Sequence, residues 1–376
     1  MLIGFDAKKI VSNLTGIGNY SRGLVNLLSA DGADKCVLFA PDKGNDKCLS
    51  GLDMNGNVEF VYSGSGSGIG KNYWRNFSIV NDIKRSGVDL FHGVSNELPF
   101  GIAKAGCKTA VTIHDLIFIR YPHTYDFLSR KILEVKTRYA CRVADRIIAV
   151  SEQTKRDIVE FYGVAPEKID VLYQGCHTAF KRRVSADEMA EVRRIYDLPE
   201  RYMVSVGTIE ERKNHRTVVD AVSRLTDDVP LLIVSKRTRL QRKIEEQIER
   251  LGLGDRVRII NGVPFNHLPA LYQGSELAIY LSYFEGFGIP VLEGITSGVP
   301  VIAATGSCLE EAGGKGAVYC DPFDAAGVAE AMHSLLTSPE RRGELVAEGE
   351  KHIAAFTDEV LGANIRAFYE KLLRGA

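Results

Sequence analysis

The sequence predicts an α/β protein made of two Rossmann-like, doubly wound domains that face each other across a cleft. Its 376 residues are long for one domain and suit two of ordinary size. Short, nearly continuous apolar runs alternate with helical patterns along the chain, as in parallel sheets whose strands are joined by helices. With 45% apolar residues, 25% charged residues and a net charge of −1, the composition is that of a soluble globular protein, not of a nucleic-acid binder.

Thirteen runs have the length and the β-branched content of buried strands. Seven lie in the first half, at residues 2–6, 36–40, 58–62, 89–93, 109–115, 146–150 and 170–173. Six lie in the second half, at residues 202–207, 230–235, 257–260, 277–282, 299–304 and 316–320. No strand is predicted between Tyr173 and Tyr202, so we predict one domain over residues 1–180 and another over residues 181–357.

The chain has the features of a cytoplasmic protein. It begins MLIGFDAKKI, which passes directly from a short apolar run to charge and does not resemble a signal peptide. It has no run of eighteen apolar residues, so we expect no membrane-spanning helix. The seven cysteines are scattered without a CxxC pair, which argues for reduced thiols and against a zinc cluster. Asp-x-Asp does not occur, so we expect no metal site.

In doubly wound domains ligands bind at the carboxyl ends of strands, so polar residues that directly follow a strand are site candidates. The stretch VGTIEERKN, residues 206–214, ends the first strand of the second half and carries Arg212 and Lys213. Asn214 is expected to cap the next helix. Two cations beside a helix N-terminus form an anion site, and a diphosphate is its natural ligand because arginine binds it with two hydrogen bonds. The alternative is a solvated, charged turn.

The stretch FEGFGIPVLEG follows another strand and contains a glycine-rich bend. Pro290 suits the first turn of a helix, where its missing N–H costs nothing. Gly286 and Gly288 let backbone amides approach a ligand without a Cβ atom in the way. The amides expected to bind a phosphate or a sugar hydroxyl are those of Phe287, Gly288 and Ile289.

Two carboxylates flank this bend. Glu293, placed in the first turn of the helix, can accept two hydrogen bonds from a cis-diol such as that of ribose. Glu285, directly before the bend, would contact the part of the ligand that lies beyond its phosphates. The alternative is that both carboxylates only complement the positive end of the helix.

The first half offers two further candidates. SNLTGIGNYSRGL, residues 12–24, follows the first strand, and the amides of Gly16 and Ile17 suit a phosphate or an acceptor. This loop is not GxGxxG and no acid ends the following strand, which disfavours a dehydrogenase. TIHDLIF puts His114 and Asp115 at the end of a strand, where a polar pair is typical of a site. The alternatives are an ordinary turn before a helix and a satisfied buried histidine.

Residues 127–147 read as a basic amphipathic helix. Its apolar face consists of Leu128, Ile132, Val135, Tyr139 and Val143. Such a helix suits the surface of an anionic membrane, and the alternative is an ordinary surface helix. The glycine–serine run SGSGSGIG, residues 63–70, is expected to form a loop.

Together, three of these motifs resemble one family. VGTIEERKN, the glutamate pair of FEGFGIPVLEG and the TIHD of the first half are similar to the retaining glycosyltransferases of family 4, which have the GT-B fold and work without metal. The resemblance runs in order from TGIGNY near residue 15 to YCDPFD at residues 319–324.

The resemblance implies a role for each candidate. Arg212 and Lys213 would stabilise the donor diphosphate, and Glu293 would bind the ribose. Glu285 would bind hydroxyls of the transferred sugar, and His114 would contact that sugar near its reacting carbon.

Further roles follow from the same resemblance. Gly16 would lie near the phosphates, and Val263 and Leu268, in NGVPFNHLPALY, would flank the nucleobase. The C-terminal helix, at about residues 358–376, would pack back on the first domain. The sequence departs from the pattern at Thr208, where some members with guanosine donors carry arginine.

The motifs most resemble mannosyltransferases and rhamnosyltransferases of bacterial surface-polysaccharide assembly. We therefore expect a nucleotide-sugar donor, GDP-mannose, a saccharide or lipid-linked saccharide acceptor, no further cofactor, and peripheral contact with an anionic membrane. UDP- and dTDP-sugars are the alternative donors. A nucleotide-sugar epimerase and a non-catalytic nucleotide-sugar binder are the alternatives from other classes.

Overall fold

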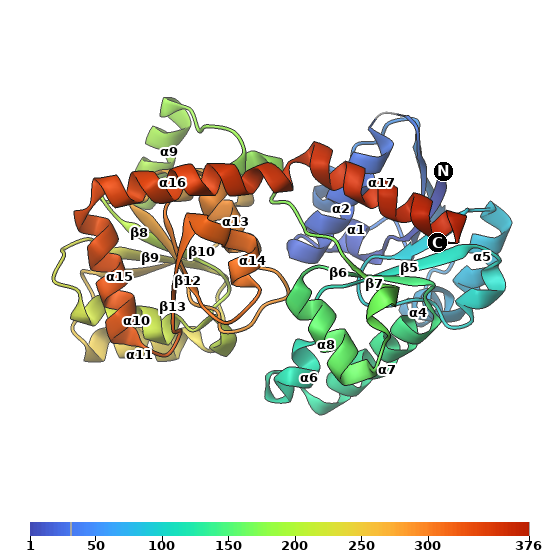
Figure 1. The fold of residues 1–376 in the computed structure, drawn as a ribbon, viewed down its shortest axis with the longest axis horizontal. Coiled ribbons are helices and arrows are strands. Elements are labelled where there is room, and N and C mark those ends of the chain that lie inside the picture. The colour runs from blue at the N-terminus through green and yellow to red at the C-terminus, as the bar shows by residue number, and fades with distance from the viewer. Residues whose placement is uncertain (31, 376) are drawn as a thin grey trace. The chain divides into compact units, whose positions relative to one another are not determined.

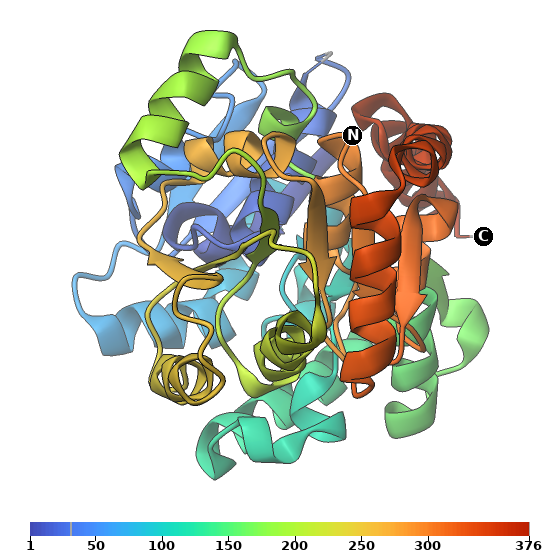
Figure 2. The ribbon, with the colours of Figure 1, turned by 90° about the vertical axis from the view of Figure 1, so that its left-hand side faces the viewer.

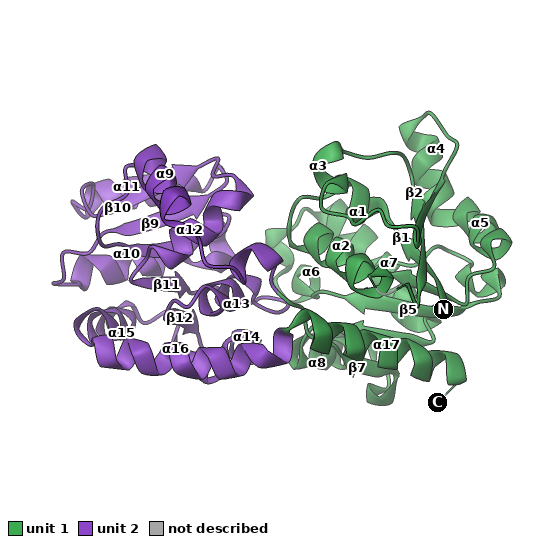
Figure 3. Ribbon diagram, turned by 90° about the horizontal axis from the view of Figure 1, so that it is seen from above, with its two compact units in different colours: residues 1–175, 357–376 green, residues 176–356 purple. Residues whose placement is uncertain are grey.

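The structure is a computed structural model that describes residues 1–30 and 32–375. The chain forms two compact units, which Figure 3 shows in different colours. Unit 1 consists of residues 1–175 and 357–376, and unit 2 consists of residues 176–356. Unit 2 begins at Cys176, five residues before the predicted boundary at residue 181. The reason is that Cys176 packs against unit 2. The Cys176 thiol donates a hydrogen bond to Thr296 Oγ1 at 3.4 Å.

Unit 1 is built on a parallel sheet with the strand order β3-β2-β1-β4-β5-β6-β7. Its strands are β1 (Leu2–Asp6), β2 (Lys35–Ala40), β3 (Val58–Tyr62), β4 (Leu90–Gly93), β5 (Lys108–Ile113), β6 (Arg146–Ala149) and β7 (Ile169–Val171). Its α-helices are α1 (Lys8–Ser12), α2 (Gly16–Ser29), α3 (Asp46–Leu49), α4 (Gly68–Tyr73), α5 (Ile79–Ser86), α6 (Ile117–Arg120), α7 (Phe127–Val143), α8 (Glu152–Tyr162) and α17 (Asp358–Arg374).

The sheet of unit 1 separates two hydrophobic cores, because alternate residues of a strand point to opposite faces. Phe5 belongs to the core shared with α2 and α17, and Phe91 belongs to the core shared with α5, α7 and α8. The C-terminal helix α17 buries one face in the first of these cores, through Ile365, Phe368, Tyr369 and Leu372.

Unit 2 is built on a second parallel sheet, with the strand order β10-β9-β8-β11-β12-β13. Its strands are β8 (Met203–Val206), β9 (Leu231–Ser235), β10 (Val257–Asn261), β11 (Leu277–Tyr280), β12 (Val301–Ala304) and β13 (Ala317–Cys320). Its α-helices are α9 (Ala186–Tyr196), α10 (His215–Arg224), α11 (Gln241–Arg250), α12 (Leu268–Gln273), α13 (Ile289–Thr296), α14 (Leu309–Gly313), α15 (Ala325–Thr337) and α16 (Pro339–Ile353). Helices cover both faces of each sheet (Figure 1, Figure 2).

All thirteen predicted strands are present, and the prediction of two doubly wound α/β halves is confirmed. The prediction of a loop over residues 63–70 is wrong for its last three residues. There the Ser67 hydroxyl accepts a hydrogen bond from the Gly70 amide and caps α4, which begins at Gly68. Within the described residues, none of the helices has the length and apolar character needed to cross a bilayer.

Candidate active site

The two motifs of unit 2 follow adjacent strands. β8 lies between β9 and β11, so the strand order reverses between β8 and β11. In open α/β sheets, ligands bind at the carboxyl edge of such a reversal. VGTIEERKN leaves the end of β8 and FEGFGIPVLEG follows β11, so the fold brings both motifs to this edge.

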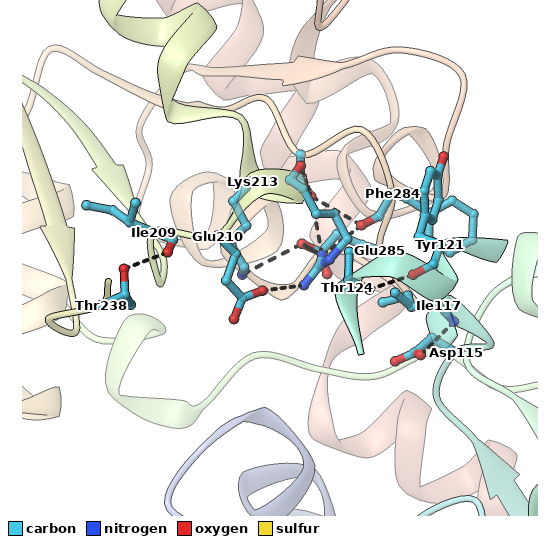
Figure 4. A network of polar contacts seen from close by, with 12 residues as sticks. Asp115, Ile117, Tyr121, Thr124, Ile209, Glu210, Lys213, Thr238, Phe284 and Glu285 are labelled. Atoms are coloured by element: carbon cyan, nitrogen blue, oxygen red, sulfur yellow. Dashed lines mark hydrogen bonds and ion pairs between the residues drawn. The ribbon is translucent and has the colours of Figure 1, made fainter. Parts of the chain in front are cut away.

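Arg212, Lys213 and Glu285 form one ion cluster there (Figure 4). A 3-10 turn, η6 (Glu211–Lys213), presents the two cations. The Arg212 guanidinium pairs with Glu285 Oε1 and donates a hydrogen bond to the carbonyl oxygen of Phe284 at 2.7 Å. Lys213 Nζ lies 3.6 Å from the same carboxylate oxygen. All three charged side chains are mostly buried, with exposed fractions between 12% and 16%.

Tyr280, at the end of β11, connects the cluster. Lys213 Nζ donates a hydrogen bond to the Tyr280 hydroxyl at 2.8 Å, and this hydroxyl donates to Glu285 Oε1 at 2.6 Å. Burial by itself raises the pKa of Glu285, but the charges of Lys213 and Arg212 outweigh it and hold this pKa at about 2. Glu285 is therefore a carboxylate at physiological pH, suited to accept hydrogen bonds and unsuited to act as a general acid.

The bend of FEGFGIPVLEG depends on Gly288. Its φ is +119°, and a Cβ atom there would lie 2.6 Å from Leu309 Cδ2. Helix α13 begins directly after it at Ile289, and Pro290 occupies the first turn as predicted. Phe287 and Gly288 are buried, and Gly286 and Ile289 are half-buried.

The placement of Glu293 in the first turn of this helix is wrong. Because α13 begins at Ile289, Glu293 lies in the second turn, and the first turn contains no acidic residue. The alternative in which this carboxylate only complements the helix N-terminus therefore loses its basis, since that effect fades beyond the first turn.

Glu293 is a buried acid, with 9% of its surface exposed. Burial raises the pKa of Glu293 to about 8, because the opposing effects of the Lys213 charge and of the Tyr272 hydroxyl are smaller. The two glutamates of one motif thus have opposite character: Glu285 is ionised and Glu293 is protonated at neutral pH.

Asn214 does not cap α10 through its side chain, contrary to the prediction. It stands at the N-cap position with a left-handed backbone, φ +55°, and its amide nitrogen donates to the carbonyl oxygen of Pro322. Its side-chain oxygen accepts from the Thr217 hydroxyl at 2.9 Å. Lys213 lies on the turn directly before Asn214. Asn214 therefore holds this turn against the loop that contains Pro322.

The two residues expected beside a nucleobase lie in the segment after β10. Val263 and Leu268 are both half-buried, and they stand on either side of the 3-10 turn η7 (Phe265–His267). Leu268 begins α12, whose Pro269 lies in the first turn.

His114 lies at the end of β5 in unit 1 and is buried, with 6% of its surface exposed. Its Nε2 is 2.9 Å from the carbonyl oxygen of Val94, which can only accept, so this nitrogen carries the proton. Its Nδ1 faces Gln174 Nε2 at 3.4 Å. Burial lowers the pKa of His114 to about 4. With both nitrogens engaged inside unit 1, the ring is a neutral, oriented group and not an available base.

The other candidates of unit 1 lie at the starts of helices α6 and α2. The Asp115 carboxylate accepts a hydrogen bond from the amide of Ile117, the first residue of α6 (Figure 4). Gly16 and Ile17 form the first turn of α2, whose amides have no acceptor within the helix. The ring of Tyr20, also on α2, meets the His114 ring edge-on at 5.0 Å.

Sequence reasoning missed the tyrosines that connect these groups. Tyr280 and Tyr272 are buried in unit 2 beside Glu285 and Glu293, and Tyr20 packs on His114 in unit 1. Tyr272 and Tyr280 stand in apolar runs of the sequence, where an aromatic residue indicates only a core position. Tyr20 lies in the polar stretch GNYSR, where nothing local indicates its contact with His114. Among the described residues, no group of three or more His, Cys, Asp or Glu side chains is arranged to hold a metal ion.

Comparison with known proteins identifies the family. The family model "Glycosyltransferase Family 4" matches residues 14–180, and the model "Glycosyl transferases group 1" matches residues 189–352. The chain belongs to the glycosyltransferases. This glycosyltransferase is 24% identical over 274 residues to the O-antigen chain mannosyltransferase B of Escherichia coli, covering 72% of this chain and 71% of that protein.

Two further similarities agree with this assignment. The glycosyltransferase is 26% identical over 253 residues to the O-antigen chain mannosyltransferase RfbU of Salmonella typhimurium, covering 65% of this chain and 68% of that protein. Its structure is similar to the crystal structure of Anabaena Alr3699/HepE in complex with UDP and glucose, with a TM-score of 0.77, 17% identity and coverage of 99% and 100%. The predicted GT-B fold and the resemblance to glycosyltransferases are confirmed.

Proposed function

We propose that this glycosyltransferase transfers mannose from GDP-mannose, with retention of configuration and without a metal ion, to a lipid-linked saccharide of a bacterial surface polysaccharide. The similarity to O-antigen mannosyltransferases of Escherichia coli and Salmonella typhimurium supports the sugar and the class of polysaccharide. Unit 2 is the donor unit in this proposal, and unit 1 is the acceptor unit.

One observation carries the proposal: two cations and two buried glutamates of opposite protonation meet at the carboxyl ends of the adjacent strands β8 and β11. A nucleoside diphosphate sugar presents a matching set of groups, which are two phosphates, a ribose diol and a second sugar. A surface ion cluster would not require Glu293 to be buried as a neutral acid, at a cost in solvation.

The nucleotide half of the donor would contact three sets of residues in unit 2. Val263 and Leu268 would flank the base, and Glu293 would accept hydrogen bonds from the ribose diol. Arg212 and Lys213 would bind the diphosphate, which then competes with Glu285 for their charge.

In the transfer step, the bond between the sugar carbon C1 and the diphosphate oxygen breaks, and its electron pair stays with the phosphate. Arg212 and Lys213 stabilise this developing charge, an effect worth about 3–4 kcal/mol for a preorganised donor. The acceptor hydroxyl attacks C1 on the same face and gives its proton to the departing phosphate. This route needs no covalent intermediate with the enzyme.

Glu285 fits a binding role better than that of a nucleophile. Its Oε1 atom is already engaged by Arg212, Tyr280 and, at longer range, Lys213, which makes the carboxylate a weak attacking group. It would accept hydrogen bonds from the hydroxyls of the transferred sugar, together with the amides of Phe287 and Gly288. In unit 1, His114 would contact that sugar as a neutral ring.

A transfer assay tests the proposal. The purified chain is given labelled GDP-mannose and lipid-linked saccharides from a strain that lacks this step, with UDP- and dTDP-sugars as competing donors. The proposal expects label in the lipid fraction from GDP-mannose. Transfer from a UDP-sugar instead would favour the donor class of the similar structure, which holds UDP. Sugar conversion without acceptor would indicate an epimerase, and binding without either reaction would indicate a binding protein.

A further inference from the structure

Exposed apolar side chains are concentrated on one part of unit 1. Among the described residues, seven of the fourteen large apolar side chains that are exposed lie in two segments, α4 with the π-helical turn η1 (Trp74–Ser78) and α7. They are Ile69 (87%), Tyr73 (63%), Phe77 (48%), Phe127 (70%), Leu128 (68%), Ile132 (49%) and Val135 (58%). We call this set, together with Phe100, the apolar surface.

The two segments form one continuous surface, because a series of aromatic rings joins them. The ring of Tyr73 lies 5.3 Å from that of Phe77, which lies 5.4 Å from that of Phe100. Phe100 in turn lies 4.7 Å from Tyr139 of α7. An open hollow of about 330 Å³ lies beside this series, lined by Phe100, Lys131, Ile132, Val135 and Lys136.

Positive charge lies along the α7 part of the apolar surface. Helix α7 carries five basic residues and one acidic residue, Glu134. The Arg130 guanidinium lies over the Phe127 ring at 5.6 Å, so a cation and an exposed aromatic ring lie next to each other on this surface. Exposed aromatic and aliphatic side chains among lysines and arginines are typical of helices that lie in the interface of an anionic bilayer.

A buried ion network fixes this surface to the sheet. Arg75 lies on η1 between Tyr73 and Phe77, with its side chain 5% exposed. It pairs with Asp6 at the end of β1 at 2.5 Å and with Glu97 at 2.8 Å. Glu97 also pairs with Lys136 of α7 at 3.0 Å.

The network therefore connects both exposed segments to the carboxyl edge of the sheet, at the point where β1 and β4 lie side by side. This is also the edge where a doubly wound domain places its ligands. A surface that only happened to be apolar would not need this rigid connection.

We propose that the apolar surface docks the glycosyltransferase on an anionic lipid bilayer and holds the carboxyl edge of unit 1 at the membrane. The inference rests on the proposed function for its purpose, since a lipid-linked saccharide would then reach unit 1 without leaving the bilayer. The sequence indicated only the basic helix at residues 127–147. The structure adds α4, η1 and Phe100 to the same docking surface, and the ion pairs of Arg75 and Glu97 hold this surface to the sheet.

Vesicle sedimentation with the full chain tests the inference. The vesicles consist of phosphatidylcholine alone or with phosphatidylglycerol, at low salt and at about 1 M salt, where screening shortens to about 3 Å. The test variant is Ile132→Glu with Val135→Glu. The matched control is Ile195→Glu with Val360→Glu, which changes two exposed apolar helix positions outside the apolar surface.

We expect the wild type and the control to sediment with anionic vesicles at low salt and to be released at high salt. The test variant should lose about tenfold or more in partitioning, with unchanged GDP affinity and unchanged transfer to a soluble saccharide. Equal binding of both variants, or no binding of the wild type, would overturn the inference. A wild-type dimer that the test variant dissociates would also overturn it, since the surface would then join two copies. Failure of transfer in the wild type with vesicle binding intact would count against the proposed function alone.

Discussion

The protonation of Glu293 leads to a prediction about donor binding. With a pKa of about 8, this acid is roughly nine-tenths protonated at pH 7. A protonated carboxyl can accept from one ribose hydroxyl but must itself donate elsewhere, whereas a carboxylate accepts from both hydroxyls. Donor binding should therefore favour the ionised form and release a proton.

The magnitude follows from the ionised fraction. About half of the Glu293 side chains are ionised at pH 8 and about 1% at pH 6, so the affinity for GDP-mannose should fall about fiftyfold over this interval. At pH 7 about 0.9 proton should be released for each donor bound. Glu285 and His114 do not contribute, because their pKa values of about 2 and 4 lie below this range.

Isothermal titration in two buffers with different ionisation enthalpies measures both quantities. GDP-mannose is the suitable ligand, since its doubly esterified diphosphate does not titrate between pH 6 and 8. Glu293→Gln should bind more weakly, without proton release and with an affinity that does not change with pH. A flat pH profile in the wild type, or the same slope in the variant, would refute the role of Glu293.

Three further measurements have defined outcomes. Lys213→Ala should lower turnover about 100-fold and weaken GDP binding in parallel, as steady-state kinetics and titration would measure; unchanged turnover would contradict the diphosphate assignment. Without ligand, Glu293→Gln should be more stable than the wild type by on the order of 5 kcal/mol in urea unfolding at pH 9 and about equal at pH 4. The sign follows because the folded pKa, about 8, exceeds the unfolded value of 4.5, so the contribution to stability is complete below pH 4.5 and is lost as pH rises through 8. Tyr369→Phe should lower stability by about 1–3 kcal/mol, because the buried His92 Nδ1 loses its partner at 2.7 Å; no change would mean that a water replaces the hydroxyl.

The central strands were predictable because they are apolar runs buried on both faces of a parallel sheet, such as LLIVS of β9. The Ser151 side chain caps α8 by accepting a hydrogen bond from the Thr154 amide, a local interaction of the kind that residue types three positions apart can indicate. Arg212, Lys213 and the two glutamates could be identified as candidates because their two motifs begin where strands end, and the fold brings such loops to one edge.

Other features depend on contacts between segments far apart in the sequence and left no local signal. Asn214 has the residue type of a cap, but its amide bonds to Pro322, 108 residues away. Tyr280 was read as part of the apolar run of β11, although its hydroxyl joins Lys213 and Glu285. The π-helical turn that directs Arg75 toward Asp6 depends on an ion pair across 69 residues.

A thermal-shift panel of GDP, UDP, dTDP and ADP, without added divalent metal, most directly tests whether unit 2 binds a nucleoside diphosphate. A ligand at about 100 times its Kd should stabilise the fold by about 2.7 kcal/mol. We predict the largest shift with GDP and its loss in Lys213→Ala. Equal melting temperatures with and without every nucleotide would contradict the diphosphate site and, with it, the proposed donor.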